Sequence, residues 1–267
     1  MKMLIDDLEY ETDELPFEAK TQITLVQFID QQIHNLQQQR TSHYLALKSA
    51  LPKPVSTGPF VLFDVGANFG TDSLHKTLGD QNIRTWAFEP TPELVNYLTT
   101  SSQDFKDRYT IVPVALSDFN GTAQFNIADN PGCDWGCSSL NTFSEGLEET
   151  WPGRTDFQFN RSIEVKVMRL DTWFRETNPG IERIDFFHCD TQGSDLKVLQ
   201  GMGEYLGLIQ AGEVECASNE RGKLYKENHT LDEMRAFLVS NGYEITSITP
   251  NDAQQNEVNV AFRKRAA

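Results

Sequence analysis

The sequence lacks any long apolar run. No stretch of the 267-residue chain approaches the roughly 18–20 consecutive apolar residues of a membrane-spanning helix. The N-terminal stretch MKMLIDDLEYETDELP is acidic and has no apolar core of the kind that secretory signals carry. These absences predict a soluble, cytoplasmic protein that has no membrane as a partner.

Positive charge is scarce. The chain has 23 Lys and Arg against 39 Asp and Glu, which gives a formal net charge of −16 at pH 7. An acidic surface repels the phosphates of nucleic acids and the headgroups of anionic lipids. The composition therefore argues against nucleic acid and anionic membranes as partners, and a small-molecule ligand fits better.

Cysteine is scarce as well. Cys189 and Cys216 fall inside expected strands, where a buried thiol is ordinary. Cys133 and Cys137 frame an expected loop, but no second cysteine pair and no histidines at matched spacing follow them. We therefore expect plain thiols rather than a disulfide or a zinc site.

Residues 1–57 differ in pattern from the rest of the chain. Between Phe17 and Leu36 apolar residues recur at helical spacing opposite a glutamine-rich face, and a second short helix is expected from Tyr44 to Leu51. We expect these residues to form a helical appendage. Its apolar stripe would pack on the core or on another subunit, so a homo-oligomer could form through these helices.

Residues 58–267 alternate apolar strands with amphipathic helices. Strands are expected at 60–66, 85–90, 109–118, 183–190 and 208–218, followed by two antiparallel neighbours at 243–248 and 257–264. This alternation predicts an α/β fold in which a mostly parallel sheet has helices on both faces. Ligands of such sheets bind beyond the carboxyl ends of the strands.

The first expected strand ends in the turn DVGANFG. Gly66 and Gly70 allow the backbone to bend tightly and to approach a ligand. Glu89 ends the next expected strand, where a carboxylate can accept both hydroxyls of a ribose. Together these residues predict half of a nucleoside site, whereas a glycine turn alone would equally fit a tight corner between strand and helix.

Motifs for phosphate binding are missing. Asn68 replaces the middle glycine of G-x-G-x-x-G, where its side chain would crowd a diphosphate, and no GK[ST] follows for a triphosphate. Asp64 suits a cationic ligand better than a phosphate. S-adenosylmethionine fits these residues because it carries a sulfonium and an ammonium but no phosphate. A nicotinamide-dependent oxidoreductase remains an alternative, since Glu89 would serve either nucleoside.

A series of motifs resembles FkbM-type methyltransferases in order and spacing: FDVGANFGTDS, AFEPTP, VALSDFNGTAQF, SSL, VMRLDTWF and IDFFHCDTQGSDLKVLQGM. The resemblance covers roughly residues 60–262. It implies a class I, S-adenosylmethionine-dependent methyltransferase with a Rossmann-like, seven-stranded sheet. It also implies O-methylation of a hydroxyl on a sugar or a small natural product, with N-methylation of a small molecule or a non-catalytic nucleoside-binding protein as alternatives.

The resemblance assigns cofactor contacts position by position. The cofactor-binding residues would be Asp64, Gly66, Ala67, Asn68, Glu89, Pro90, Ser117, Asp118 and Asp190. The first four would line the methionine part of the cofactor, and Glu89 would hold the ribose. Ser117 and Asp118, at the end of the third expected strand, would flank the adenine, unless Asp118 is only a turn residue before Asn120 and Gly121.

The fourth expected strand departs from the family pattern K-x-D-x-E/Q-G-x-E. Here the sequence reads HCDTQGSD, with His188 in place of the lysine. Period-two alternation puts His188 and Asp190 on the same side of the strand, so we expect one of them to remove the acceptor's proton. The competing interpretation of His188 is a satisfied core histidine. A divalent cation between Asp190 and Glu215 is a further hypothesis, although we expect no metal.

The segment 119–170 is long for a crossover between two strands. It contains two expected strands, 120–127 and 162–170, with aromatic and polar residues between them. We expect this insertion to cover the substrate site, because loops carry specificity. The candidate acceptor contacts are Trp135, Ser139, Trp151 and Arg154. The competing interpretation is a satellite hydrophobic cluster that pins a long loop.

Overall fold

The computed structural model describes residues 2–5, 8–11, 58–129 and 135–266. The chain divides into two compact units, Met1–Val55 and Ser56–Ala267. In the first unit, β1 (Lys2–Ile5) and β2 (Leu8–Glu11) pair as an antiparallel hairpin. The helices expected further along residues 1–57, and the oligomer contact expected of them, lie outside the described residues.

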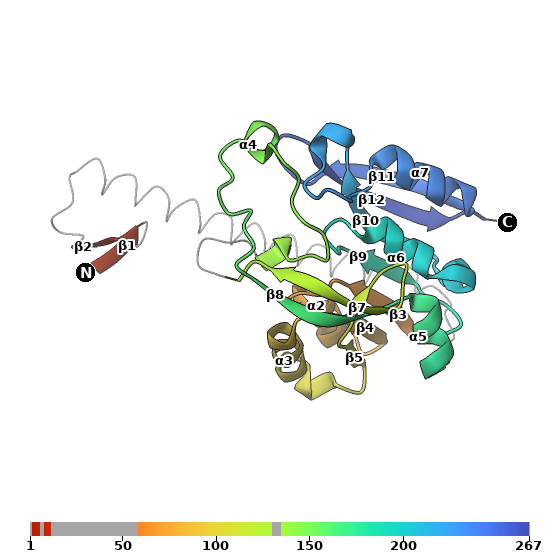
Figure 1. Cartoon of the computed structure of the whole chain (residues 1–267). Coiled ribbons are helices and arrows are strands. Elements are labelled where there is room, and N and C mark those ends of the chain that lie inside the picture. The colour runs from red at the N-terminus through yellow and green to blue at the C-terminus, as the bar shows by residue number, and fades with distance from the viewer. Residues whose placement is uncertain (1, 6–7, 12–57, 130–134, 267) are drawn as a thin grey trace, which may run out of the picture. The chain divides into compact units, whose positions relative to one another are not determined.

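Seven strands form the main sheet of the second unit (Figure 1). In spatial order they are β11 (Tyr243–Pro250), β12 (Glu257–Lys264), β10 (Ala211–Ala217), β9 (Phe186–Cys189), β3 (Phe60–Val65), β4 (Ile83–Phe88) and β5 (Tyr109–Val112). Paired neighbours are parallel, except that β12 runs antiparallel to both β10 and β11. This confirms the predicted seven-stranded, Rossmann-like sheet.

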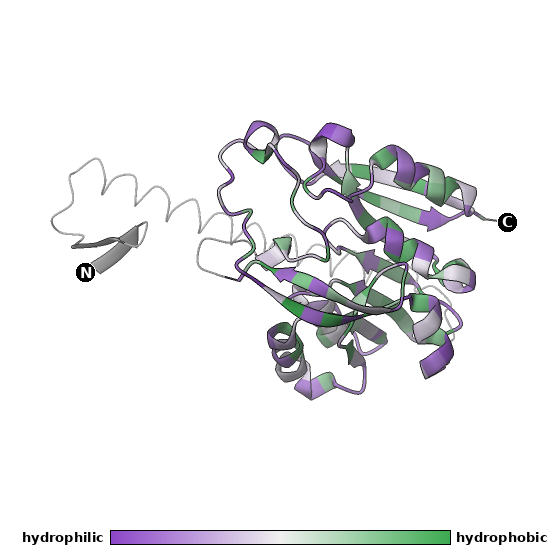
Figure 2. Ribbon diagram, viewed as in Figure 1, coloured by the Kyte–Doolittle hydropathy of each residue, from purple (hydrophilic) through white to green (hydrophobic). Residues whose placement is uncertain are grey.

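The two faces of the sheet are covered by different helices. One face carries α2 (Thr71–Gly79) and α3 (Pro92–Ser101), and the other carries α5 (Leu170–Thr177), α6 (Asp195–Gly201) and α7 (Leu231–Ser240). Side chains along a strand point alternately to the two faces of the sheet. Phe63 of β3 packs on the face that carries α5 and α6, whereas Ala87 of β4 packs with Leu98 of α3 on the other face. In Figure 2 the helices carry both hydrophobic and hydrophilic residues, as expected of helices with one face on a sheet and the other in water.

The described helices are short. The ten residues of α3 and of α7 span about 15 Å each, half of a bilayer's hydrocarbon core. Within the described part of the chain, no helix combines the length and the apolar character needed to cross a membrane.

A smaller, three-stranded sheet follows β5. Its order is β6 (Ala115–Leu116), β8 (Arg161–Met168) and β7 (Gly121–Ile127), with β7 antiparallel and β6 parallel to β8. Both strands expected in the insertion are therefore present. The short helix α4 (Leu147–Thr150) lies between β7 and β8, and single 3-10 turns occur at Gln103–Phe105, Trp135–Cys137, Gly203–Leu208 and Glu220–Gly222.

The third expected strand is divided, so the prediction of one strand over 109–118 is wrong. β5 ends at Val112, and the chain re-enters a strand at Ala115 in the smaller sheet. Pro113 lies between the two pieces and has no N–H for the ladder, and Val114 N bonds back to Val112 O at 2.9 Å. Ser117 and Asp118 therefore do not end a strand of the main sheet.

Candidate functional site

Three strand ends meet at the carboxyl edge of the main sheet. The register sets Val65 of β3 beside Phe88 of β4 and Cys189 of β9, so the residues that follow these strands face a common space. A cavity opens there, which we call the first cavity. Its turn and polar residues include Gly66, Asn68, Glu89, Pro90, Thr91, Asp190 and Gln192. Its other lining residues include 114–116, Phe125, Trp135, Gly136, Ser138 and Leu140.

The turn after β3 depends on Gly66. Its φ is +77°, and a Cβ at this position would lie 1.9 Å from the backbone oxygen of Asp190. The Gly66 N–H donates to Phe88 O at 3.0 Å, which ties the turn to β4. No other residue type allows this approach, so the glycine draws the turns after β3 and β9 together.

Glu89 is a buried carboxylate that lines the first cavity. Its carboxylate accepts the N–H of Asn68 at 2.9 Å and the N–H of Thr91 at 2.8 Å, and the residue is 4% exposed. Burial raises the pKa of Glu89, while these hydrogen bonds oppose the rise. Each carboxylate oxygen keeps a further lone pair with which it can accept a ribose hydroxyl.

The first cavity fits S-adenosylmethionine by its donor set. Asn68 has φ +50°, and its Oδ1 is buried with no hydrogen-bond partner among the described residues, so a polar ligand group could bind it. Apolar side chains of Val114, Leu116 and Phe125 line the same cavity and suit a purine ring. With Glu89 for the ribose, these groups can hold each part of the expected nucleoside.

Two residues of the glycine turn lie outside the first cavity. Asp64 points to the opposite side of β3 from Val65, because side chains alternate, and is 5% exposed. Ala67 packs with Leu74 and Leu98 in the core beneath α2 and α3. Neither residue therefore lines the cavity where the methionine part of the cofactor was expected to contact it.

His188 binds Asp64 and does not line the first cavity. The distance from His188 Nδ1 to Asp64 Oδ1 is 2.9 Å. Burial lowers the pKa of His188, but the hydrogen bond and charge of Asp64, with Asp190 and Glu213, outweigh burial and raise the pKa to about 9. A protonated imidazole cannot accept a proton. The alternation argument also fails, because β9 ends at Cys189 and Asp190 belongs to the turn.

Asp190 does line the first cavity and is held by Gln192. Its Oδ1 accepts the Gln192 Nε2–H at 2.6 Å, and the same Nε2 lies 3.4 Å from Glu215 Oε2. Gln192 has φ +55°, and its Oε1 accepts the Tyr225 hydroxyl at 2.7 Å. The amide therefore stands between two carboxylates in a fixed orientation.

Three buried acids, Asp195, Glu215 and Glu257, lie near the half-buried Asp190. Burial raises the pKa of Asp190, Asp195, Glu215 and Glu257, and their mutual repulsion adds to the rise for each except Asp190, where Asp64 adds instead. The pKa of Asp195 reaches about 7 and that of Glu257 about 8. Asp195 is also structural, since it accepts the N–H groups of Thr191 and Glu215.

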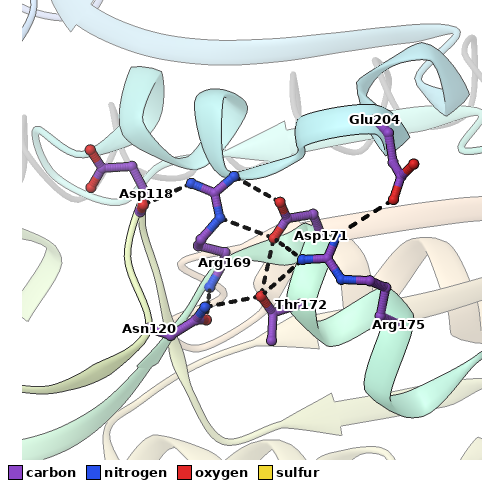
Figure 3. Close-up of polar contacts among 7 residues, drawn as sticks. All are labelled: Asp118, Asn120, Arg169, Asp171, Thr172, Arg175 and Glu204. Carbon is purple, nitrogen blue, oxygen red and sulfur yellow. Dashed lines mark hydrogen bonds and ion pairs between the residues drawn. The ribbon is translucent and has the colours of Figure 1, made fainter.

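Ser117 and Asp118 do not line the first cavity, so the adenine contact expected of them is not supported. A Cβ added to Gly201, the last residue of α6, would lie 2.3 Å from the backbone oxygen of Ser117, so Ser117 packs against the end of that helix. The Asp118 carbonyl accepts a hydrogen bond from Arg169 at 2.8 Å, while its carboxylate points away from the Arg169–Asp171 ion pair (Figure 3). Both residues thus belong to the packing of the small sheet against α5 and α6.

The candidate acceptor contacts fall in two places. Trp135 lines the first cavity, and Ser139 is fully buried, with its hydroxyl donating to Gln192 O at 2.6 Å. Trp151 and Arg154 line a neighbouring second cavity. The second cavity is formed by Gly136, Cys137, Trp151, Arg154, Phe157, Gln192, Leu224, Asn251, Asp252 and Glu257.

The aromatic residues of the insertion also form a packed cluster. Trp151 meets Phe157 edge to face at 5.3 Å between centroids, and Phe143 stacks on Phe159 at 4.1 Å and on Tyr225 at 5.4 Å. Ser144 N donates to Leu224 O, and Asn256 Nδ2 donates to Thr150 O. The insertion is therefore pinned by a satellite cluster, and the same cluster forms one wall of the second cavity.

Two residues beside the cavities were not anticipated from the sequence. Tyr225 is fully buried and orients Gln192, and Glu257 begins the reversed strand β12 at the same edge. Neither lies near a motif. Among the described residues, no group of three His, Cys, Asp or Glu could hold a metal ion, and Cys189 and Cys216 are buried free thiols.

A family model matches most of the second unit. It is described as the methyltransferase FkbM domain, and it matches residues 64–245. The matched range includes the three strand ends of the first cavity and the whole insertion.

Two named relatives are similar in sequence. The 2-O-methyltransferase NoeI of Sinorhizobium fredii is 30% identical over 150 residues, which cover 55% of this chain and 58% of NoeI, less than two thirds of that protein's length. The methyltransferase sdnD of Sordaria araneosa is 26% identical over 208 residues, which cover 71% of this chain and 75% of sdnD.

Solved structures are similar at lower identity. TrmK of M. capricolum in complex with S-adenosylhomocysteine is 12% identical with a TM-score of 0.42, over 79% of this chain and 65% of TrmK. Magnesium protoporphyrin IX methyltransferase of Synechocystis PCC 6803 with bound S-adenosylmethionine is 11% identical with a TM-score of 0.43, over 87% of this chain and 80% of that one.

Proposed function

Because the chain belongs to the FkbM family of S-adenosylmethionine-dependent methyltransferases, we propose that it methylates a hydroxyl group on a sugar or a small natural product. The observation that carries this proposal is the position of Asp190. Asp190 lines the first cavity, and its carboxylate is fixed by Gln192, which also lines the second cavity. A hydroxyl approaching from the second cavity would meet a base beside the cofactor.

The residues of the first cavity would bind the cofactor. Glu89 would accept the ribose hydroxyls, with Pro90 beside it. Gly66 and Asn68 would contact the methionine end, where Asn68 Oδ1 has no hydrogen-bond partner in the described part of the chain. The apolar wall that includes Phe125 would exclude water from the purine.

Bound S-adenosylmethionine supplies a methyl group that its sulfonium already activates. The chain has to align the acceptor hydroxyl with that methyl and accept its proton. When the acceptor oxygen takes the methyl group it loses its proton, and the Asp190 carboxylate would accept that proton. Burial raises the pKa of Asp190, which makes its ionised form a stronger base than an exposed aspartate.

The test is turnover of Asp190→Asn with cofactor affinity measured alongside. The amide keeps the shape and cannot take the proton, so we expect turnover to fall about 10²–10⁴-fold while affinity for S-adenosylmethionine changes little. Asp232→Asn is the control, because that side chain is 91% exposed. Near-normal turnover of Asp190→Asn would assign the proton to another group.

The hydroxyl assignment itself is tested by the product. Mass spectrometry and NMR of the methylated acceptor should locate the new methyl on oxygen. A methyl on nitrogen would show N-methylation. Titration with NADH should give no binding in competition with S-adenosylmethionine, and preferential NADH binding would contradict the cofactor assignment.

A further inference from the structure

The first and second cavities adjoin. Gly136 and Gln192 line both of them, so a ligand in the second cavity lies next to the Gln192 amide that binds Asp190. We propose that the second cavity binds the methyl acceptor and that this acceptor is a neutral, polyhydroxylated ring of pyranose type. The proposal rests on the methyl transfer proposed above.

Planar polar side chains dominate one part of the second cavity. They are Arg154, Gln192, Asn251, Asp252 and Glu257. Amide, carboxyl and guanidinium groups each offer two donors or acceptors in a plane. The Gln192 amide is already bound to Asp190 and Tyr225, and each Asp252 oxygen already accepts one backbone N–H. The lone pairs that remain on the carboxyl groups of Asp252 and Glu257 can accept neighbouring hydroxyls, which a compound with a single hydroxyl would not use.

Trp151 offers a donor that the described residues do not use. The residue is 3% exposed and lines the second cavity, and its Nε1 has no hydrogen-bond partner among the described residues. Buried indole N–H groups usually find a partner, and leaving one unmade costs about 1–3 kcal/mol. A hydroxyl oxygen bound in the cavity would satisfy it.

Apolar surface completes the cavity. Phe157 and Leu224 line it beside Trp151, and the Arg154 guanidinium lies 4.0 Å from the centroid of the Phe157 ring. The same guanidinium is held by Asp156 through bonds of 2.7 and 2.8 Å. A pyranose has an apolar C–H face as well as hydroxyls, so it can pack on these rings while its edge is hydrogen-bonded.

The charges favour a neutral ligand. Arg154 disfavours an ammonium group in the second cavity, and Asp252 disfavours a carboxylate or phosphate. Burial, with the nearby charges of Asp190 and Asp252, raises the pKa of Glu257 to about 8, so this carboxyl is mainly protonated at pH 7 and can donate to a hydroxyl.

The test measures binding of pyranosides to the full chain saturated with S-adenosylhomocysteine. The probes are the methyl pyranosides of glucose, galactose, mannose and N-acetylglucosamine, with cyclohexylamine as a cationic probe of similar size, and the readout is saturation-transfer NMR. We expect at least one pyranoside to bind. Its affinity should fall about tenfold or more in Arg154→Ala and several-fold in Trp151→Phe, as the loss of one hydrogen bond predicts.

Arg183→Ala is the matched control. Arg183 is also paired with the aspartate two residues later, at 2.6 Å, but it does not line the second cavity. Equal pyranoside affinity in all three variants would overturn the location. Binding of cyclohexylamine in place of every pyranoside, or of no probe at all, would overturn the ligand class. Failure of S-adenosylhomocysteine to bind would instead refute the proposed function.

Discussion

The first cavity is built from turns that follow neighbouring strands, whereas the second is built from side chains of segments far apart in the chain. In the first cavity, Gly66 lies against the backbone of Asp190, and the Glu89 carboxylate accepts the backbone N–H of Asn68. In the second, Arg154, Gln192 and Glu257 converge through hydrogen bonds and ring packing. The difference implies that changes in the first cavity disturb the fold together with the site, while changes in the second alter ligand binding with less effect on stability.

The largest expected effect is that of Gly66→Ala. The new Cβ would lie 1.9 Å from Asp190 O, at a φ of +77°. We expect a loss of about 3 kcal/mol or more in the free energy of unfolding, from steric overlap and backbone strain together, with loss of cofactor binding. Chemical denaturation and calorimetry check both.

Gly153→Ala separates the two causes. Its φ is +83°, but no atom of the residues that the structure describes lies within 4 Å of a Cβ there. Gly153→Ala should lower the free energy of unfolding by only about 1 kcal/mol, which is the contribution of backbone strain, and should keep its affinity for the cofactor. Equal losses in the two variants would show that contact with Asp190 does not matter.

The next effect is on cofactor affinity. Glu89→Gln replaces an oxygen that accepts the Asn68 or Thr91 N–H by an amide nitrogen that cannot. Affinity for S-adenosylmethionine should fall about 10–100-fold, as expected for hydrogen bonds to a charged group. Calorimetry of the folded variant measures this, and Glu93→Gln, on the exposed start of α3, serves as the control. Unchanged affinity would refute the ribose assignment.

A smaller effect is expected in the link between the cavities. Tyr225→Phe removes the hydroxyl that donates to Gln192 Oε1 and leaves the ring packing intact. Turnover should fall about tenfold, equivalent to one hydrogen bond, with cofactor affinity nearly unchanged. The control is Tyr243→Phe, since that buried hydroxyl donates to Leu206 O away from both cavities. If both variants lose stability but keep full turnover, the hydrogen bond from Tyr225 to Gln192 is not needed for the reaction.

The smallest effect concerns pH. The pKa of Glu257 is raised from 4.5 to about 8 in the folded chain, so the folded state binds the proton more tightly than the unfolded state. Its contribution to stability is present below about pH 4.5 and is lost as the pH rises through about 8. Glu257→Gln should therefore show a smaller loss of stability between these pH values than the parent chain. Denaturation across this range tests it, with the exposed Glu220→Gln expected to follow the parent.

The sequence was most informative for residues that form a turn or directly follow a strand. Alternating apolar strands, the glycine turn and Glu89 at the next strand end were enough to predict the sheet and much of the first cavity. Pro113 was the overlooked signal, since it divides the third strand and moves Asp118 out of the cavity. Tyr225 and Glu257 could not be predicted, because only tertiary contacts bring them to Gln192 and Asp190.

The reversed direction of β12 has a consequence for how this enzyme could diversify. Because β12 runs against its neighbours, its first residue, Glu257, stands at the edge where the parallel strands end, and the β11–β12 hairpin turn that contains Asn251 and Asp252 projects over that edge. Hairpin turns tolerate insertion and deletion far better than strand interiors. A longer or shorter turn here would reshape the second cavity while leaving Glu89 and Asp190 of the first cavity in place, so the two cavities could change independently in related chains.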